Sequence, residues 1–218
     1  MKILLMGATG RSGKFVIKEA IKRGHSIVAI ARNPEKLKGV AIEVIPGTPY
    51  DYETVDKAIT GCSAVINVLN VSRKSDNPWA SPAAPPDLIS KLAFNAVKAM
   101  EKPGILRYIA LGALGAGRSW TIIPFIMKFV FSCSNLKLAI RDHGRQEEIL
   151  ERSSLDYTVC RAPMLSTKIN GTGVVVSPDN VKPSGPVLSR NSEAEFFIRI
   201  IENNEYVREI INLSNGPK

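Results

Sequence analysis

Short apolar runs alternate with amphipathic stretches along most of the chain. The runs Ile3–Met6, Ile27–Ile30 and Ala64–Leu69 have the length of strands, and the last is apolar on both faces, as a central parallel strand is. Further strands are expected at 40–45, 105–111, 157–160 and 207–213, and helices at 51–60, 88–100, 136–152 and 192–202. This alternation predicts an α/β fold with a doubly wound parallel sheet covered by helices on both faces.

Residues with clear positional preferences mark several of these boundaries. Asp51 is a plausible N-cap and Gly61 a plausible stop for the helix between them, and Ser192-Glu193-Ala194-Glu195 is expected to cap the last helix. The segment 70–87 is polar, rich in proline and long for a connection, and loops of that kind are usually functional or mobile.

The turn after the first strand, Gly7-Ala8-Thr9-Gly10-Arg11-Ser12-Gly13, carries the clearest motif. Gly7 allows a sharp turn, Gly10 allows the backbone to approach a pyrophosphate, and Gly13 allows the helix to pack closely on the strand. The N–H groups that open this helix would face the phosphates. A G-x-x-G-x-x-G turn between strand and helix therefore predicts a dinucleotide site, and with it a Rossmann-type sheet of order 3-2-1-4-5-6 with room for a seventh strand.

The residue at the end of the second strand, Arg32, bears on the choice of nicotinamide cofactor. An acidic residue there would bind the ribose hydroxyls of NAD, whereas a guanidinium suits the 2′-phosphate of NADP. Lys36 and Arg11 could add further positive charge. The alternative is that Arg32 is a solvated loop cation. NADP, bound as NADPH, is the predicted cofactor.

Length and composition indicate one globular domain over 1–218. Within it we expect a substrate-side region formed by about 113–135 and 163–190. The net charge is +9, but the sequence contains no block of five or more Lys or Arg residues, so we expect no nucleic-acid partner. The three cysteines have no metal-binding spacing, so no metal is expected, and their number suits a cytoplasmic protein.

No apolar stretch is long enough to predict a transmembrane segment. The apolar segment 120–131 leaves three interpretations open: a lid over the substrate, a dimer face or a contact with a membrane surface. The chain is accordingly expected to be a monomer or a homodimer. Trp79, Trp120 and Phe125 could line an aromatic pocket, although ordinary core packing explains each equally well.

The chain resembles the atypical short-chain dehydrogenase/reductases with an NmrA-like, NAD(P)-binding fold. The resemblance rests on the turn GATGRSG, on Arg32, and on the run DHGRQEEIL followed by SSLDYTVCRAPML. Within that family the chain resembles NADPH-dependent flavin reductases of the biliverdin reductase B type. The resemblance implies that Thr9, Gly10, Arg11 and Ser12 bind the pyrophosphate, and that Arg32 and Lys36 bind the 2′-phosphate. It also implies that Thr48 and Pro49 lie beside the adenine, that Leu69 and Asn70 flank the ribose, and that Pro163, Met164 and Leu165 cover the nicotinamide amide.

The acid–base pair common among dehydrogenases of this kind is missing. None of the five tyrosines has a lysine four residues later, and Gly112-Ala113 stands where a serine or threonine is common. His143 is the best side-chain candidate for catalysis, because it is adjacent to Asp142 and a histidine can titrate near neutral pH. A helix-cap or surface pair is an equally good interpretation of these two residues.

Two functions follow. The first is an NADPH-dependent oxidoreductase that passes hydride to a flat small-molecule acceptor such as a flavin or quinone, which needs a rigidly held cofactor and little side-chain acid. The second is a non-enzymatic NADP-binding regulator or redox sensor of the NmrA-like type, which the missing tyrosine and serine favour. Dehydratase, epimerase or isomerase chemistry is a third hypothesis.

Overall fold

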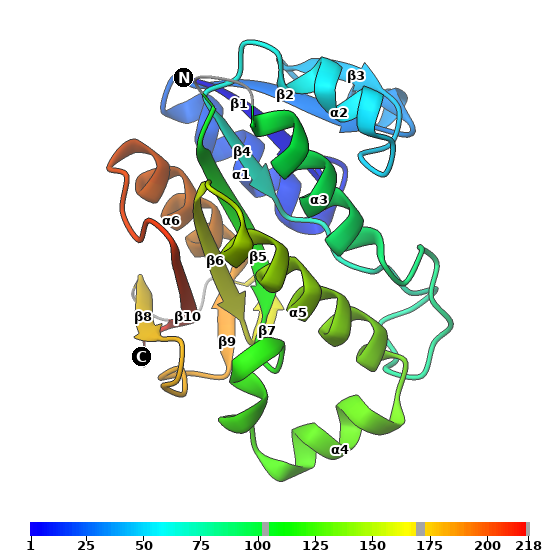
Figure 1. Ribbon diagram of the computed structural model, residues 1–218, viewed down its shortest axis with the longest axis vertical. Helices are drawn as coiled ribbons and strands as arrows, with labels where there is room; N and C mark the ends of the chain where they lie inside the picture. The colour runs from blue at the N-terminus through cyan, green and yellow to red at the C-terminus, as the bar shows by residue number, and fades with distance from the viewer. Residues whose placement is uncertain (102–104, 169–172, 217–218) are drawn as a thin grey trace.

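The computed structural model describes residues 1–101, 105–168 and 173–216 (Figure 1). The large sheet comprises β1 (Lys2–Met6), β2 (Ser26–Ala31), β3 (Glu43–Pro46), β4 (Ala64–Asn67), β5 (Arg107–Ala113), β6 (Asp156–Ala162), β8 (Val174–Pro178) and β10 (Glu209–Asn215). The helices are α1 (Arg11–Lys22), α2 (Tyr52–Ile59), α3 (Leu88–Met100), α4 (Phe125–Cys133), α5 (Leu136–Arg152) and α6 (Arg190–Glu202), with short 3₁₀ turns η1 (Pro34–Leu37) and η2 (Gly117–Thr121). A separate two-stranded sheet joins β7 (Met164–Ser166) to β9 (Val187–Ser189).

The strand order of the large sheet is β3-β2-β1-β4-β5-β6-β10-β8. All neighbouring strands from β3 to β10 pair in parallel, and β8 pairs antiparallel with β10. The predicted order 3-2-1-4-5-6 is confirmed, and β10 is the seventh strand. Because the direction of winding reverses between β1 and β4, the loops at the carboxyl ends of these two strands flank the crevice in which such sheets bind ligands.

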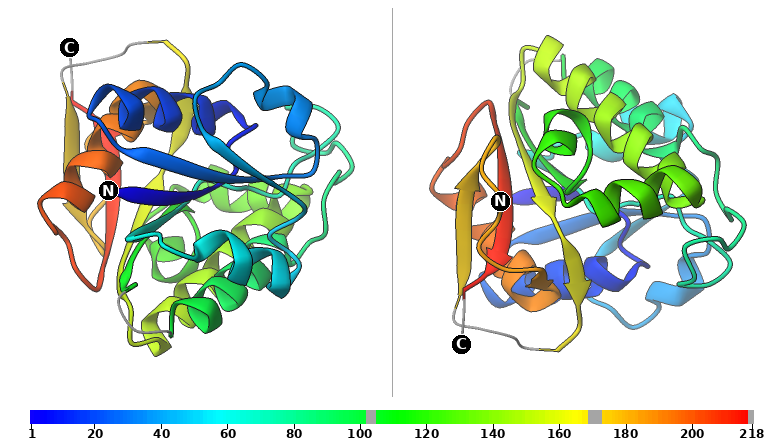
Figure 2. Two further views of the ribbon diagram at one scale, coloured as in Figure 1. Left: turned by 90° about the horizontal axis from the view of Figure 1, so that it is seen from above. Right: turned by 90° about the horizontal axis from the view of Figure 1, so that it is seen from below.

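Alternate residues of β1 belong to two different cores. Ile3 and Leu5 pack with the layer formed by α1 and α6, and Leu4 and Met6 pack with the layer formed by α2, α3 and α5. All four side chains are fully buried. Figure 2 shows the sheet between these two helical layers. The apolar character of both faces of the central strands follows from this arrangement.

The boundaries of the helices match the sequence pattern with one correction. The helices over 88–100 and 136–152 are found at those residues, and the side chain of Asp51 accepts a hydrogen bond from Thr54 N–H at the start of α2. The expected cap at Ser192 is wrong. The cap is Ser189, whose hydroxyl accepts a hydrogen bond from Asn191 N–H, and the hydroxyl of Ser192 instead accepts one from the Asn215 amide.

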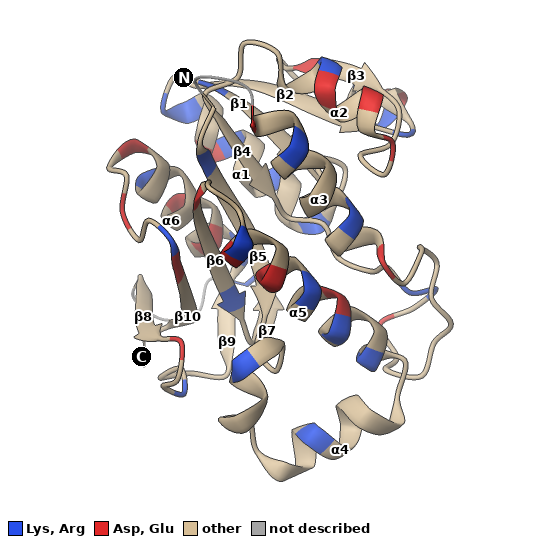
Figure 3. Cartoon of the chain, viewed as in Figure 1, with Lys and Arg blue, Asp and Glu red and all other residues tan. Residues whose placement is uncertain are grey.

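The apolar segment 120–131 forms the end of η2, a short connection and most of α4, at the bottom of Figure 1. Three of its side chains are strongly exposed: Phe125 (83%), Ile126 (64%) and Phe129 (57%). Figure 3 shows a single basic band, that of Lys128, on an otherwise uncharged α4. Within the described part of the chain, no helix combines the length and apolar character needed to cross a membrane.

Residues 169–172, which fall within the expected substrate-side region, lie outside the described residues. On either side of them the chain forms β7, β8 and β9. The division of the chain into a cofactor part and a substrate part stays a prediction.

Candidate functional site

The turn between β1 and α1 has the geometry that its glycines predict. Gly7 has a φ of +99°, a left-handed conformation that side chains other than hydrogen disfavour. A Cβ on Gly13 would lie 2.2 Å from the carbonyl oxygen of Gly7 and 2.7 Å from the Cα of Ala8, so only glycine lets α1 pack this closely on β1. A Cβ on Gly10 would meet only the Gly7 carbonyl oxygen, at 3.1 Å, and otherwise open space.

The N-terminus of α1 is available to an anion. Its N-cap is Gly10, no side chain caps it among the described residues, and its first turn contains no acidic residue. Thr9, Gly10 and Arg11 are exposed around it. The first N–H groups of a helix have no partner within the helix, and its dipole favours negative charge there. The residues present therefore fit the phosphates of a dinucleotide.

Arg11 is already engaged by the long loop that follows β4. Its guanidinium forms two hydrogen bonds with the carboxylate of Asp76, at 2.8 and 3.1 Å. Both side chains are exposed, at 65% and 81%. This pair holds the 70–87 loop beside the glycine turn, and the sequence alone did not indicate it.

At the end of β2, Arg32 and Lys36 are both exposed, and neither forms an ion pair with any described residue. Arg32 directly follows the last residue of β2, and Lys36 lies in η1. The two cations therefore lie without counter-charge at the place where the second strand of such a sheet meets the adenosine ribose. Their binding of a 2′-phosphate stays a prediction.

The remaining predicted cofactor contacts are distributed over the loops that follow β3, β4 and β6. Pro49 is buried and its carbonyl accepts a hydrogen bond from Asn95, while the hydroxyl of Thr48 accepts one from Tyr50 N–H. Leu69 is half-buried and its N–H donates to the side-chain oxygen of Asn67, whereas Asn70 is exposed. These loops all lie at the carboxyl edge of the sheet.

Two backbone groups of the segment after β6 already have hydrogen-bond partners within the protein. The N–H of Met164 donates to the Pro186 carbonyl at 3.2 Å, and the carbonyl of Leu165 accepts a hydrogen bond from Arg190 at 3.1 Å. Pro163 and Leu165 are half-buried, and the Met164 side chain is 64% exposed. Any contact of this segment with a nicotinamide amide must therefore use its other backbone groups.

The largest departure from the expected site is at Ser12. Its side chain is buried, and its hydroxyl donates a hydrogen bond to Glu193 Oε2 on α6 at 3.0 Å. Glu193 is fully buried, and burial raises the pKa of its carboxyl to about 7. Its other oxygen, Oε1, has no hydrogen-bond partner among the described residues. Ser12 thus reaches into the protein in this structure.

Arg190, one turn before Glu193 on α6, is a second residue that the sequence did not indicate. It is 8% exposed, and its Nε has no hydrogen-bond partner among the described residues. Burial lowers the pKa of its guanidinium, the positive charge of Arg11 lowers it further, and the charges of Glu193 and Asp76 oppose both effects. Arg190 thus lies close to Arg11, the arginine of the glycine turn. The spacing of Arg190 and Glu193, three residues apart on one helix, was the only available signal.

The structure separates His143 from Asp142. Asp142 accepts hydrogen bonds from the N–H groups of Ile89 and Ser90, and so satisfies the first turn of α3. His143 is 1% exposed, and neither ring nitrogen has a partner among the described residues. Burial lowers its pKa to about 4, so the imidazole is neutral near pH 7. The interpretation as a surface pair is wrong, and a catalytic role of His143 stays a prediction.

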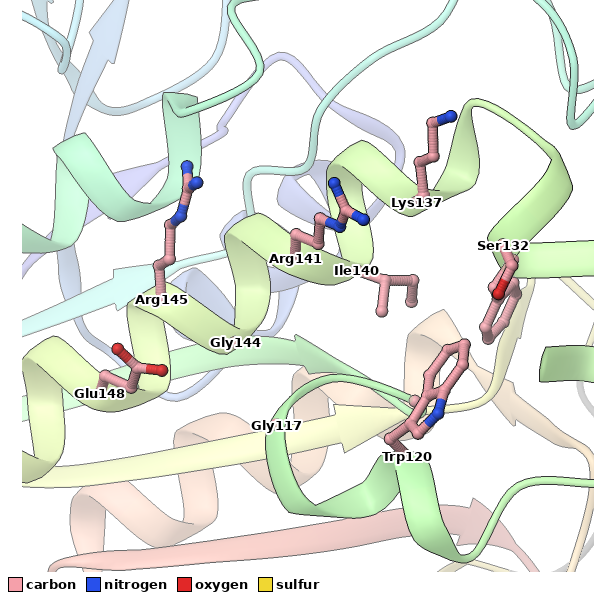
Figure 4. A pocket seen from close by; sticks show the side chains of 11 residues that line it. Gly117, Trp120, Ser132, Lys137, Ile140, Arg141, Gly144, Arg145 and Glu148 are labelled. Carbon is pink, nitrogen blue, oxygen red and sulfur yellow. The ribbon is translucent and has the colours of Figure 1, made fainter.

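A cavity of about 500 Å³ lies between α5, η2 and the end of α4 (Figure 4). Trp120 and Phe131 line it, with ring centroids 6.5 Å apart and planes tilted by 37°. Gly115, which also lines it, follows Leu114, whose N–H donates to the Ala162 carbonyl at the end of β6. The cavity therefore adjoins the strand end from which the predicted nicotinamide loop leaves the sheet.

The side chains around this cavity differ in kind. Figure 4 shows Trp120 on one side of the cavity and the side chains of Lys137 and Arg141 on α5, so that the lining combines aromatic and apolar groups with charged ones. Trp79 and Phe125 do not line the cavity, and their side chains are 58% and 83% exposed. Of the three aromatic residues considered for a pocket, only Trp120 is therefore found there.

Tyr157 and Arg161, which have tyrosine–lysine spacing, are structural. Tyr157 is buried within β6, and the fully buried Arg161 forms two hydrogen bonds with Glu147, at 2.7 and 2.8 Å. Arg161 also contacts Asp179. In the described part of the chain, no three or more His, Cys, Asp or Glu side chains are grouped so that they could hold a metal ion.

Comparison with known proteins gives concordant results. A family model described as NAD(P)H-binding matches residues 7–204. Over 219 aligned residues the chain is 25% identical to the photosystem II assembly factor Ycf39 of Synechocystis, covering 96% of this chain but 61% of that protein. The chain thus spans about three fifths of the length of this relative.

Two solved structures share the fold over nearly the whole chain. ChuY of Escherichia coli O157:H7, described as an anaerobilin reductase, superposes with a TM-score of 0.78 at 22% identity, covering 98% of this chain and 96% of ChuY. A short-chain dehydrogenase/reductase of Veillonella parvula, solved in complex with NADP, superposes with a TM-score of 0.78 at 18% identity, covering 99% and 94%. At these identities the likeness concerns the fold.

Proposed function

The chain belongs to the NAD(P)H-binding family, among the atypical short-chain dehydrogenase/reductases, and from this premise we propose that it is an NADPH-dependent reductase. In this proposal it passes hydride to a flat acceptor such as a flavin or a quinone. The observation that carries the proposal is the turn Gly7–Gly13, where closely packed glycines place the uncapped N-terminus of α1 at the carboxyl edge of the sheet.

The preference for NADPH rests on Arg32 and Lys36. Both are exposed cations without an ion-pair partner among the described residues, at the end of β2 and in η1. A guanidinium can bind a phosphate through two parallel hydrogen bonds, which the ribose hydroxyls of NADH do not offer. The 2′-phosphate would therefore be held by this pair.

The acceptor would occupy the cavity beside Trp120 and Phe131. The aromatic side chains supply apolar surface on which a flat ring could pack, and the cavity of about 500 Å³ is within the usual range for small-molecule sites. Bound NADPH supplies the hydride. The protein contributes binding and orientation, because a cofactor and acceptor held in contact react far faster than the free molecules.

A side-chain acid is not required for this chemistry. His143 is neutral near pH 7 because burial lowers its pKa to about 4, and it can therefore donate one hydrogen bond but holds no spare proton. The acceptor would take its proton from water. A reduced flavin or quinone tolerates this, since its negative charge is delocalised, whereas a ketone substrate would need a proton donor such as tyrosine.

The same observations also support a second function, that of a non-enzymatic NADP-binding regulator. The chain lacks the tyrosine–lysine pair, and α4 exposes Phe125, Ile126 and Phe129. A regulator would bind the cofactor tightly and turn nothing over. This difference gives a direct way to separate the two functions.

The experiment is steady-state oxidation of NADPH, followed at 340 nm, with FMN, riboflavin and a short-chain quinone as acceptors. We expect turnover with at least one of them. Tight binding of NADPH without oxidation by any acceptor would favour the regulator. Absence of NADPH binding would contradict both functions.

We further expect Arg32→Ala to weaken NADPH binding about tenfold to hundredfold, as for the loss of a hydrogen bond to a charged group, and to leave NADH binding nearly unchanged. Lys38→Ala is the matched control, because Lys38 is an exposed cation of the same loop that already pairs with Glu35. Dissociation constants from isothermal titration calorimetry give the comparison. Equal losses for both cofactors would contradict the assignment of Arg32.

A further inference from the structure

Ser12 and Glu193 join the phosphate turn to α6. Ser12 is the second residue of α1, and the hydrogen bond from its hydroxyl to Glu193 Oε2 spans 3.0 Å in a buried environment. Helices α1 and α6 pack against each other with their N-termini at the same edge of the sheet, where Figure 2 shows them side by side. A buried carboxyl therefore lies beside the N–H groups that would bind a pyrophosphate.

A serine hydroxyl has one proton and can donate one hydrogen bond. In this structure the Ser12 hydroxyl donates its hydrogen bond to Glu193, so it cannot donate one to a phosphate oxygen. If Glu193 is protonated, the direction of the hydrogen bond reverses: the carboxylic acid donates to the Ser12 oxygen, and the serine proton becomes free to turn toward the cofactor. No atom of either side chain has to leave its place.

On the basis of the proposed cofactor site, we propose that Glu193 is a positioning residue that couples cofactor binding to the uptake of one proton, by setting the direction of the Ser12 hydroxyl. The proton comes from solvent and is held on the Glu193 carboxyl while the pyrophosphate is bound. When the cofactor leaves, the proton returns to solvent.

The charges around Glu193 support this coupling. On α6, Arg190 is the cation that acts on it; on β6, the nearby Cys160 is a buried thiol whose pKa is raised by burial; on α1, Ser12 donates the hydrogen bond. Oε1 has no hydrogen-bond partner among the described residues, so the charged carboxylate is poorly satisfied. A pyrophosphate bound close by adds negative charge and shifts the carboxyl further toward its neutral form.

Isothermal titration calorimetry of NADPH binding, in two buffers of different ionisation enthalpy, measures the protons taken up. For the wild-type protein at pH 7.5 we expect a net uptake of protons attributable to Glu193. Between pH 6 and pH 9 the affinity for NADPH should fall by about tenfold for each unit by which binding raises the pKa of the Glu193 carboxyl. The 2′-phosphate of NADPH also titrates, so the informative quantity is the difference between protein variants.

Glu193→Gln is the informative variant, because its amide can donate to Ser12 permanently. We expect it to abolish the additional proton uptake and to keep the affinity of the low-pH wild type across the range. Glu195→Gln is the matched control on the same helix, since Glu195 bonds to Asn191 and not to the turn. Its profile should equal that of the wild type.

The outcomes separate this inference from the proposed function. Absence of nicotinamide binding at every pH would overturn the cofactor site itself. Tight binding with identical proton uptake in the wild type and in Glu193→Gln would overturn the role of Glu193 alone. Should Glu193→Gln fail to fold, repeating the two-buffer measurement on the wild type with NADH, which has no 2′-phosphate, still decides the matter, because zero uptake contradicts the coupling.

Discussion

Glu147 and Glu193 are both buried carboxylates near the carboxyl edge of the sheet, at 3% and 0% exposure, but their partners differ. Glu147 uses both oxygens to bind Arg161, which is itself fully buried and also contacts Asp179. Glu193 has one hydroxyl partner and one oxygen without a partner among the described residues. A buried charge with complete pairing has a structural role, whereas one left incompletely paired beside a ligand site is free to respond to the ligand.

The network around Glu147 extends to the surface. Asp179 also binds Arg118, which in turn binds Glu151, both at 2.7 Å. Burial alone would raise the pKa of Asp179, but its hydrogen bonds to Arg118 and Arg161 outweigh that effect and lower it. Gly117 fits against this network, since a Cβ there would lie 2.1 Å from Glu147 Oε2. The network therefore anchors the start of η2, which lines the proposed acceptor cavity.

The largest expected effect is that of Glu147→Gln. The substitution leaves the Arg161 guanidinium buried without its main counter-charge, so we expect the free energy of unfolding to fall by about 3–5 kcal/mol. Urea denaturation followed by circular dichroism measures it, and Glu148→Gln, at an exposed neighbour, is the control. A loss below about 1 kcal/mol would contradict the structural role.

The corresponding substitution at Glu193, Glu193→Gln, should raise the free energy of unfolding at alkaline pH, whereas Glu147→Gln lowers it. Because burial raises the pKa of Glu193 from 4.5 to about 7, the folded state holds a proton that the unfolded state releases above pH 4.5. The stability of the wild type therefore falls as the pH rises from about 4.5 through 7. We expect Glu193→Gln to be more stable than the wild type at pH 8.5, by up to about 3 kcal/mol.

Urea denaturation at pH 5 and at pH 8.5 tests this sign. The advantage of Glu193→Gln should be present at pH 8.5 and small at pH 5. A variant that is less stable than the wild type at both values would remove the distinction between the two carboxylates.

The smallest effect is expected at the exposed pair of Arg11 and Asp76. Asp76→Asn should change the free energy of unfolding by less than about 1 kcal/mol, because both side chains are largely solvated. It should also free Arg11 for the cofactor and so tighten NADPH binding slightly at low salt. Titrations at two salt concentrations, together with urea denaturation, measure both quantities. A stability loss comparable to that of Glu147→Gln would show that the exposed Arg11–Asp76 pair contributes as much to stability as the buried Arg161–Glu147 pair, against the prediction.

Features set by local pattern were predicted well from the sequence. The helices over 88–100 and 136–152 have the expected bounds, and the strand order around β1 follows from the alternation of elements. The glycine turn also has the expected conformation at Gly7 and the expected close contact at Gly13. These features depend on backbone conformation and on neighbours within a few residues.

Features that depend on packing between distant elements were predicted poorly. Asp142 and His143 are adjacent in sequence, but successive residues of a helix point in different directions, so one reaches α3 and the other is buried without a partner among the described residues. The cap of α6 was placed three residues late, because Ser192 and Ser189 are both acceptable caps and only the end of β9 selects Ser189.

The sequence by itself thus determined the strand order of the sheet and the close-packed glycine turn after its first strand, because glycine spacing and apolar periodicity act locally. Only the tertiary structure decided that Ser12 bonds to a carboxyl 181 residues away, and that Arg190 lies close to Arg11 of the same turn. The packing of α1 on α6 brings these residues together, and burial then changes their proton affinity. Neither effect leaves a pattern in the linear order of residues.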